Sequence, residues 1–175
     1  MNMIKTRNIY IISDTHFSHS NFLNFLNEKN EKIRNFSSIE EMDELMIQNW
    51  NNTVKQNDIV YHLGDVFFND GYKHLHRLNG RKRLIIGNHD NLNSQSQLFK
   101  YFEKIMMWRI FKEFNCVLTH VPIHESSLYK VEYNLHGHIH QQASPTTQHI
   151  NCCVELNEYT PKNIEDIMKR KLKKL

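Results

Sequence analysis

The sequence predicts an α/β fold in which helices lie outside two β-sheets. Runs of β-forming residues alternate with segments of helical period over the first 100 residues, and several short strands follow one another after that. A length of 175 residues suits one sizeable core, so we expect residues 1–175 to form a single domain. With 39% hydrophobic and 23% charged residues, a disordered or fibrous chain is excluded.

The first half of the chain is expected to run strand, helix, strand, helix, strand. Four consecutive β-formers, Ile9 to Ile12, indicate a buried strand. A capping box from Ser38 to Glu41 begins an amphipathic segment, and Asn79-Gly80 is a helix stop. The predicted strands cover residues 5–12, 58–62 and 83–86, and the predicted helices cover residues 39–54 and 73–78.

The second half is expected to be richer in strands. Residues 95–103 have helical character, and the predicted strands cover residues 105–111, 114–119, 133–135 and 150–156. An apolar stripe that starts at Ile164 predicts a closing helix. Residues 161–175 hold six Lys or Arg against two Asp or Glu, which we interpret as a solvated helix face rather than a nucleic-acid surface.

The cellular location is expected to be the cytoplasm. The apolar run from Ile9 to Ile12 is too short for a membrane span or a signal peptide, so no membrane partner is predicted. The three cysteines include the adjacent pair Cys152 and Cys153, which indicates no disulfide framework and a reducing compartment.

Five predicted strands end in clusters rich in Asp, Asn and His. Ligands of open α/β sheets bind at the carboxyl ends of strands, so we expect the clusters to converge on one site. Three of only five glycines, Gly64, Gly87 and Gly137, directly precede a cluster, which indicates a backbone constraint at the site. The clusters contain Asp14 and His16, Asp65, Asn88 to Asp90, His120, and His138 with His140.

The composition of these clusters predicts a metal centre. Imidazole with carboxylate and carboxamide oxygen suits divalent Mn, Fe, Zn or Co better than Ca or Mg. Two carboxylates and four imidazoles are too many ligands for one ion with an open position, so two ions that share a carboxylate are predicted. Each residue alone is more simply a turn former or a core histidine; only the ordered set favours a site.

The same clusters together resemble the signature of the calcineurin-like metallophosphoesterase superfamily, and in particular its compact bacterial and phage members. The resemblance spans residues 14–140, and its most specific parts are Gly-Asn-His-Asp at 87–90 and Gly-His-x-His at 137–140. It implies a four-layer α/β/β/α sandwich with two divalent transition-metal ions. Manganese is the favoured metal, with Fe, Zn, Ni or Co as alternatives.

The resemblance also implies residue roles. Asp14, His16 and His140 would hold the first metal; Asn88, His120 and His138 would hold the second; Asp65 would bridge both. His89 would face the substrate as a general acid, with Asp90 orienting its ring. A hydroxide between the two ions would attack phosphorus in line.

The leading prediction is an enzyme that hydrolyses a small phosphodiester or phosphomonoester, such as a nucleotide or a cyclic nucleotide. The loops at 18–36 and 122–134 are expected to set specificity, with His19, Arg34, Tyr129 and Lys130 as substrate contacts. A metal-dependent nuclease is the alternative that the basic C-terminal segment motivates, although nucleic acid is the less favoured partner. A noncatalytic metal-binding interaction module is the second alternative. The oligomeric state is not predicted.

Overall fold

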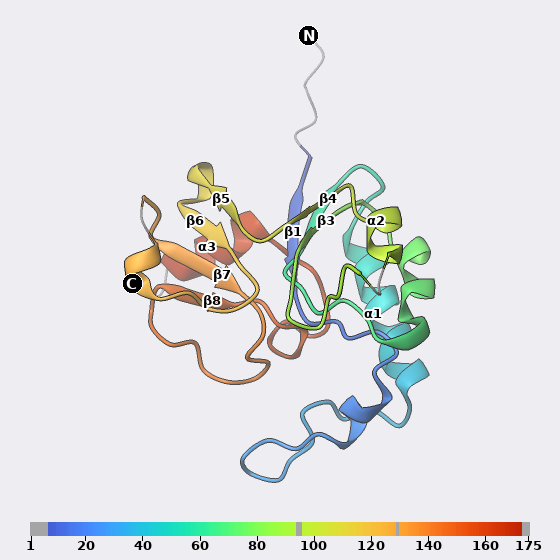
Figure 1. The fold of residues 1–175 in the computed structure, drawn as a ribbon. Helices are drawn as coiled ribbons and strands as arrows, with labels where there is room; N and C mark the ends of the chain where they lie inside the picture. Colours follow the sequence, from blue (N-terminus) through green and yellow to red (C-terminus); the bar gives the residue numbers. More distant parts are fainter. Residues whose placement is uncertain (1–6, 94–95, 129, 173–175) are drawn as a thin grey trace.

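Two β-sheets packed face to face form the centre of the molecule (Figure 1). The computed structural model describes residues 7–93, 96–128 and 130–172. The first sheet has the order β4-β3-β2-β1-β9 and the second the order β5-β6-β7-β8. In the first sheet the strands are β1 (Ile9–Ile12), β2 (Ile59–His62), β3 (Arg81–Ile85), β4 (Lys104–Met106) and β9 (Lys162–Asn163); in the second they are β5 (Arg109–Phe111), β6 (Cys116–Leu118), β7 (Tyr133–His136) and β8 (His149–Asn151).

Parallel pairing dominates both sheets. Strands β1 to β4 are parallel, and β9 is an antiparallel edge strand beside β1. Strands β6, β7 and β8 are also parallel, with β5 antiparallel at the edge. The α/β class expected from the sequence is confirmed, and the carboxyl ends of the parallel strands within each sheet lie at one edge.

Helix α1 (Ile39–Thr53) covers the outer face of the first sheet together with α2 (Gln97–Tyr101) and the 3₁₀ segment η2 (Asn69–Arg77). The Ser38 side chain accepts a hydrogen bond from the Glu41 amide at 3.2 Å, which is the predicted cap. Trp50 is buried, and its indole NH donates to the Asn79 carbonyl at 2.9 Å. No helix among the described residues is long and apolar enough to cross a membrane.

The central strands β1 and β2 of the first sheet are covered on both faces. Ile12 and Val60 belong to the core beneath α1, whereas the neighbouring Ile11 and Tyr61 belong to the core between the sheets. This alternation explains the near-continuous apolar runs of β1 and β2, which are typical of strands covered on both sides.

The outer face of the second sheet has a different cover. Asn134 and His149 point away from the first sheet, and the described residues of the segment 121–131, which include the 3₁₀ turn η4 (Glu125–Ser127), lie over them. The Ile123 amide donates to the Asn134 side chain at 2.9 Å, and the Ile123 carbonyl lies 2.7 Å from His149 Nε2. Helix α3 (Ile164–Leu172) packs instead against β1, β9 and the core between the sheets. The predicted four-layer sandwich is confirmed. In the part of the chain that the structure describes, a loop and not a helix forms most of the outer layer on the second sheet.

Three predicted elements differ in detail. The predicted strand 105–111 is two strands in different sheets, because the chain crosses from one sheet to the other at Met107-Trp108. The predicted helix 73–78 is part of η2, whose Gly71 backbone packs tightly against Phe17. The predicted strand 150–156 ends at Asn151, and the 3₁₀ turn η5 (Val154–Leu156) follows.

Candidate metal centre

The five predicted polar clusters meet at one place between the two sheets. They follow β1, β2 and β3 of the first sheet and β6 and β7 of the second. Backbone hydrogen bonds join their loops, from the Asp14 amide to the Gly64 carbonyl at 3.0 Å and from the Gly137 amide to the His120 carbonyl at 2.8 Å. The predicted convergence at the strand ends is therefore confirmed.

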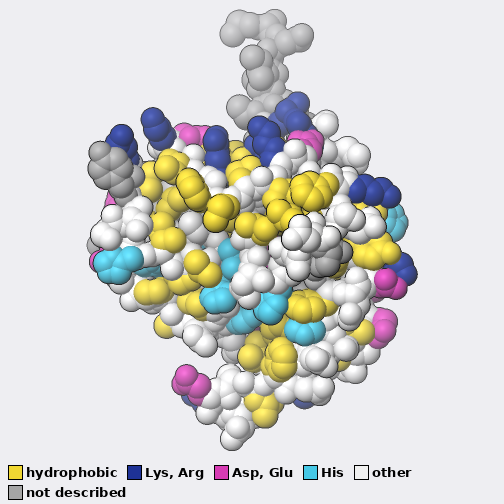
Figure 2. All heavy atoms as spheres, viewed as in Figure 1, with side chains coloured by type: hydrophobic (Ala, Val, Ile, Leu, Met, Phe, Trp, Pro, Cys, Tyr) yellow, Lys and Arg dark blue, Asp and Glu magenta, His cyan; other side chains and the backbone are white. Residues whose placement is uncertain are grey.

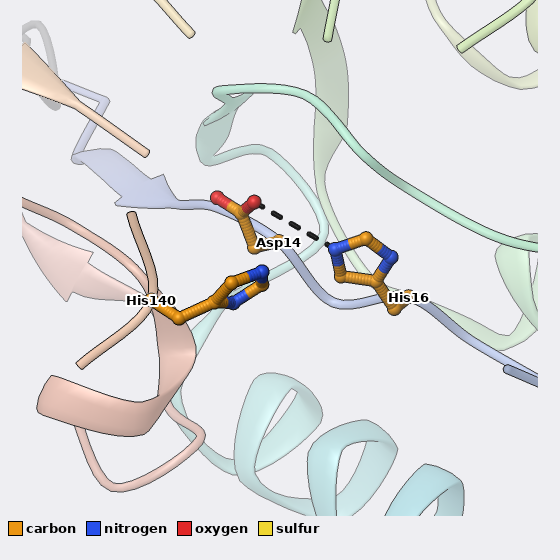
Figure 3. Close-up of side chains that lie close together, drawn as sticks. All are labelled: Asp14, His16 and His140. Carbon is orange, nitrogen blue, oxygen red and sulfur yellow. Dashed lines mark ion pairs between the residues drawn. The ribbon is translucent and has the colours of Figure 1, made fainter. Parts of the chain in front are cut away.

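The first group of candidate ligands consists of Asp14, His16 and His140 (Figure 3). Their ligand atoms lie within 4.8 Å of one another, and Asp14 Oδ1 is 3.7 Å from His16 Nε2. Asp14 Oδ1 and both ring nitrogens of His16 are buried and have no hydrogen-bond partner among the described residues. Because an unpaired buried polar atom typically costs about 1–3 kcal/mol, these atoms fit a cation that would pair with them.

The second group consists of Asp65, His120 and His138, again with ligand atoms within 4.8 Å of one another. Asn88 joins it, because its Oδ1 lies 2.8 Å from His120 Nε2 and 2.8 Å from His138 Nδ1. His120 Nδ1 is 2.7 Å from the Leu63 carbonyl, which can only accept, so Nδ1 carries the proton. The lone pair of Nε2 is then directed at the centre, as a metal-ligating imidazole requires.

The Asp65 carboxylate faces ring nitrogens of both groups. Its Oδ2 lies 3.7 Å from His16 Nε2 and 3.5 Å from His120 Nε2. Its Oδ1 accepts a hydrogen bond from the His89 amide at 2.9 Å, which leaves Oδ2 facing the space between the groups. A carboxylate in this position can be shared by two cations.

The backbone of the centre is strained. Positive φ angles are uncommon for residues other than glycine and cost on the order of 1–3 kcal/mol each, so their concentration here indicates a functional constraint. Gly137 packs so closely on Ser13 and Asp14 that no Cβ fits, which explains one of the glycines singled out in the sequence. Five of the seven predicted ligands have φ between 48° and 72°: Asp14, His16, Asp65, His138 and His140.

A hydrogen-bond network that sequence reasoning missed orients the first group. Asp14 Oδ2 accepts from the His138 amide at 2.9 Å and from the Cys153 thiol at 3.3 Å. Glu155 Oε1 lies 3.1 Å from His140 Nδ1, which directs His140 Nε2 toward Asp14 and His16. Glu155 belongs to no motif, so only its position in space reveals this role.

Arg34 was predicted as a substrate contact, and the structure places it elsewhere. Its side chain is fully buried, and the guanidinium lies 4.0 Å from the centre of the Phe22 ring. It donates to the carbonyls of Asp14 and Thr15 and forms an ion pair with Glu155 at 2.7 Å. Because Asp14 and Thr15 are fully buried, their carbonyls need a buried donor, and Arg34 supplies it in place of reaching a phosphate.

Asp90 also has a different task from the one predicted. Its carboxylate accepts hydrogen bonds from the amides of Asp65 and Gly87 at 2.8 Å and of Val66 at 2.9 Å. These bonds hold the turn that carries Asp65, so the structure does not show the predicted orientation of the His89 ring by Asp90. The His89 side chain is 49% exposed, and its Nε2 lies 4.0 Å from Asp65 Oδ2, at the open side of the centre.

The other predicted substrate contacts have different outcomes. His19 stacks on Phe68 with ring centres 3.9 Å apart, and its ring centre is 5.6 Å from that of His16. Its Nδ1 is buried without a hydrogen-bond partner in the described residues, so His19 stays a candidate beside the first group. Lys130 is exposed on the segment 121–131 and stays a prediction, and Tyr129 lies outside the described residues.

The titratable groups are in the states that metal ligands need. Burial raises the pKa of Asp14, but the contact with His16 and the nearby imidazoles outweigh burial and hold that pKa below its ordinary value. Burial lowers the pKa of His16 to about 4. Burial, with Asp14 and Asp90 nearby, raises the pKa of Asp65 to about 6. An ionised Asp14 and a neutral His16 suit a divalent cation, and a cation would relieve the unfavourable environment of the Asp65 carboxylate.

His62 makes the stability of the metal-free protein dependent on pH. It is fully buried between Thr15 Oγ1 at 2.9 Å and the Gly64 amide at 3.2 Å, and burial lowers its pKa to about 3. Since the pKa is depressed on folding, its contribution to stability is complete above the ordinary value of 6.5 and is lost as the pH falls toward 3. The free energy of unfolding, measured with urea in EDTA, should decrease between pH 7.5 and pH 5 in the wild-type protein. In His62→Gln this decrease should be smaller by about 2 kcal/mol.

The control for this experiment is His76→Gln, because His76 is exposed on η2. His16 and His136 have pKa values lowered to about 4 by burial, so part of the pH dependence should persist in every variant. An unchanged pH dependence in His62→Gln would contradict the assignment to His62.

The chain is similar to several known proteins. Residues 8–157 match the calcineurin-like phosphoesterase superfamily domain. An uncharacterized protein of Methanocaldococcus jannaschii is 33% identical over 93% of this chain and 90% of its own length. The gene 66 protein of Mycobacterium phage L5 is 33% identical over 47% of this chain and 40% of its own length. The crystal structure of a protein of unknown function from Aquifex aeolicus superposes with a TM-score of 0.74 at 29% identity, covering 94% of this chain and all of that one.

Proposed function

The chain belongs to the calcineurin-like phosphoesterase superfamily, and on this premise we propose that it is a two-metal enzyme that hydrolyses a small phosphodiester or phosphomonoester. The observation that carries the proposal is the position of Asp65 Oδ2, 3.7 Å from His16 Nε2 and 3.5 Å from His120 Nε2. It places one carboxylate oxygen where two ligand groups meet.

Each ion would have its own ligands. Asp14, His16 and His140 would hold the first ion and Asn88, His120 and His138 the second, with Asp65 shared. Two divalent cations held there would activate a water molecule at neutral pH and would offset the negative charge of the phosphoryl oxygens. Manganese is the favoured metal, because imidazole mixed with carboxylate and amide oxygen suits it and its neighbours Fe, Co, Ni and Zn.

The residues of the chain itself do the remaining work. Arg34 and Asp90 hold the backbone turns that carry Asp14 and Asp65. Glu155 keeps the His140 ring in place. The half-exposed His89 lies at the open side, within reach of a substrate, where it would donate a proton to the departing oxygen.

A small substrate fits the charge distribution better than a nucleic acid. Arg170 and Lys171 of α3 line a cavity of about 620 Å³ between α3 and β8, and none of the candidate metal ligands lines this cavity. An extended polyanion would need cations beside the centre, and a nuclease would lose activity steeply with added salt. A shallow dependence on salt supports the small ester.

The test is a metal titration combined with turnover. We expect elemental analysis to approach two manganese ions per chain, with hydrolysis of bis-p-nitrophenyl phosphate that EDTA removes and manganese restores. A metal content that stays near one at saturation would contradict the shared-carboxylate centre. Two bound ions without hydrolysis of any ester in a panel of nucleotides and cyclic nucleotides would favour the noncatalytic alternative.

A further inference from the structure

A pocket of about 480 Å³ opens on the outer side of the second sheet. Its lining comes from three parts of the fold: the adjacent Ile110 and Val117 of β5 and β6, Ile123 and Val131 of the segment 121–131, and Trp108 of the crossover between the sheets. The volume lies within the range of small-molecule sites, about 300–1,000 Å³.

The pocket is continuous with the candidate metal centre. Gly87, Asn88 and His120 line it, and Asn88 Oδ1 and His120 Nε2 are 2.8 Å apart within the second ligand group. A ligand whose phosphoryl group lay at the centre would therefore have its organic group directed into this pocket.

The chemistry of the lining selects an uncharged group. Among the described residues that line the pocket there is no Asp, Glu, Lys or Arg, and the polar side-chain groups are those of Asn88, Thr119, His120 and Ser127 and the indole NH of Trp108. The Thr119 hydroxyl is already used, because it donates to the Val121 carbonyl at 2.6 Å. The wall can therefore offer a ligand few hydrogen bonds and no salt bridge.

The rim of the pocket exposes large apolar side chains. Met107 is 70% exposed, Trp108 59%, Val121 43% and Ile110 41%. Contiguous exposed apolar surface marks a binding site in a soluble protein. Figure 2 shows hydrophobic side chains gathered on the same face as a group of histidines. An exposed indole offers a flat face on which a planar ring can stack.

We infer that this pocket binds the organic group of the phosphoester and selects an uncharged planar ring, with Trp108 as a specificity-determining residue. The inference rests on the proposed function, since it requires a phosphoryl group at the metal centre. A nucleobase and the aryl group of a non-nucleotide ester share this chemistry.

The experiment measures binding without turnover. Isothermal titration calorimetry of the manganese-loaded protein compares phenylphosphonate with methylphosphonate, two non-hydrolysable probes that differ in the ring. The wild-type protein should bind phenylphosphonate about tenfold more tightly, as typical aromatic stacking predicts. Trp108→Ala should lose most of this preference and Trp108→Phe should keep part of it. A third titration, with the phosphonate analogue of adenosine 5′-monophosphate, distinguishes a nucleobase site from an aryl site.

The matched control is Phe99→Ala, because Phe99 is an aromatic side chain on α2 that is 61% exposed and does not line the pocket. It should keep the full preference for phenylphosphonate. Equal affinities for the two phosphonates in the wild-type protein, or an equal loss in Phe99→Ala, would overturn the inference. A Trp108→Ala variant that changes the sedimenting mass but keeps the preference would show a protein contact at this surface and would overturn it too.

Failure of the pocket and failure of the proposed function give different results. Metal content and hydrolysis of bis-p-nitrophenyl phosphate are measured on the same samples. Turnover without a preference for phenylphosphonate overturns the inference about the pocket and leaves the proposed function in place. A preference for the ring without turnover of any ester overturns the enzymatic proposal and leaves the pocket as a binding site.

Discussion

Asp65→Asn is expected to lower turnover by more than about 100-fold and to reduce the bound metal from two ions toward one or none. Loss of a residue that merely orients a ligand costs about 10–100-fold in metal affinity or activity, and Asp65 is placed to contact both ions directly. Its Oδ2 faces both His16 and His120, so substitution by the amide would remove a negative charge that lies between the two ligand groups. Turnover and elemental analysis of the purified variant measure the two effects.

The same substitution should stabilise the metal-free protein. The pKa of Asp65 is raised to about 6, mainly by burial, so folding favours the protonated carboxyl group. Its contribution to stability is complete below the ordinary pKa of 3.8 and is lost as the pH rises through 6. At pH 7.5 in EDTA, Asp65→Asn should therefore raise the free energy of unfolding, on the order of 2 kcal/mol. The Asn oxygen can still accept from the His89 amide, which Asp65 Oδ1 does at 2.9 Å.

Lower turnover together with higher stability of the metal-free protein would distinguish the loss of a shared metal ligand from a folding defect, because a folding defect would lower both. Asp58→Asn is the matched control: Asp58 is a buried carboxylate that accepts from the amides of Asn8 and Lys55, at the other end of β2. We expect it to keep two ions. If Asp65→Asn retained near-normal turnover while His140→Ala abolished it, the shared carboxylate would be assigned to the wrong residue.

The site was predictable to the extent that it depends on strand ends. Parallel strands place their carboxyl ends at one edge of a sheet, so the polar residues that follow β1, β2 and β3 lie together, as do those that follow β6 and β7. The packing of the two sheets then brings the two sets to one site. The glycines were informative for the same local reason: Gly137 leaves space for Ser13 and Asp14, which no other residue could do. Local sequence was enough because each cluster is only a few residues from the strand that positions it.

The parts that were not predictable depend on contacts between distant segments. Arg34 and Glu155 are 121 positions apart, and their ion pair beneath the first ligand group follows no periodicity. Trp108 lies within a predicted strand, and only the crossing of the chain between the sheets exposes it. The family resemblance implied that Asp90 orients the His89 ring, whereas its carboxylate accepts hydrogen bonds from the turn at Asp65 and Val66.

His89→Asn is expected to affect turnover according to the leaving group. A general acid matters most when the departing oxygen is a poor leaving group, as the alkoxide of a nucleotide ester is, and least when it is a stable phenolate. Turnover of a nucleotide ester should fall on the order of 10²–10⁴-fold, and turnover of bis-p-nitrophenyl phosphate should fall far less. Metal content should stay at the wild-type value, because the His89 ring is half-exposed and lies 4.0 Å from Asp65 Oδ2.

His120→Asn provides the contrast, since His120 Nε2 lies 3.5 Å from Asp65 Oδ2 and 2.8 Å from Asn88 Oδ1 within the second ligand group. The His120→Asn variant should lose the second ion, and its turnover of both substrates should fall by the same factor. His76→Asn, on the surface of η2, should change neither metal content nor turnover. Equal losses on the two esters for His89→Asn, or a decrease in its bound metal, would contradict proton donation. The ratio of the two losses is the decisive quantity, because a general decrease in folding or metal loading lowers both activities and leaves their ratio unchanged.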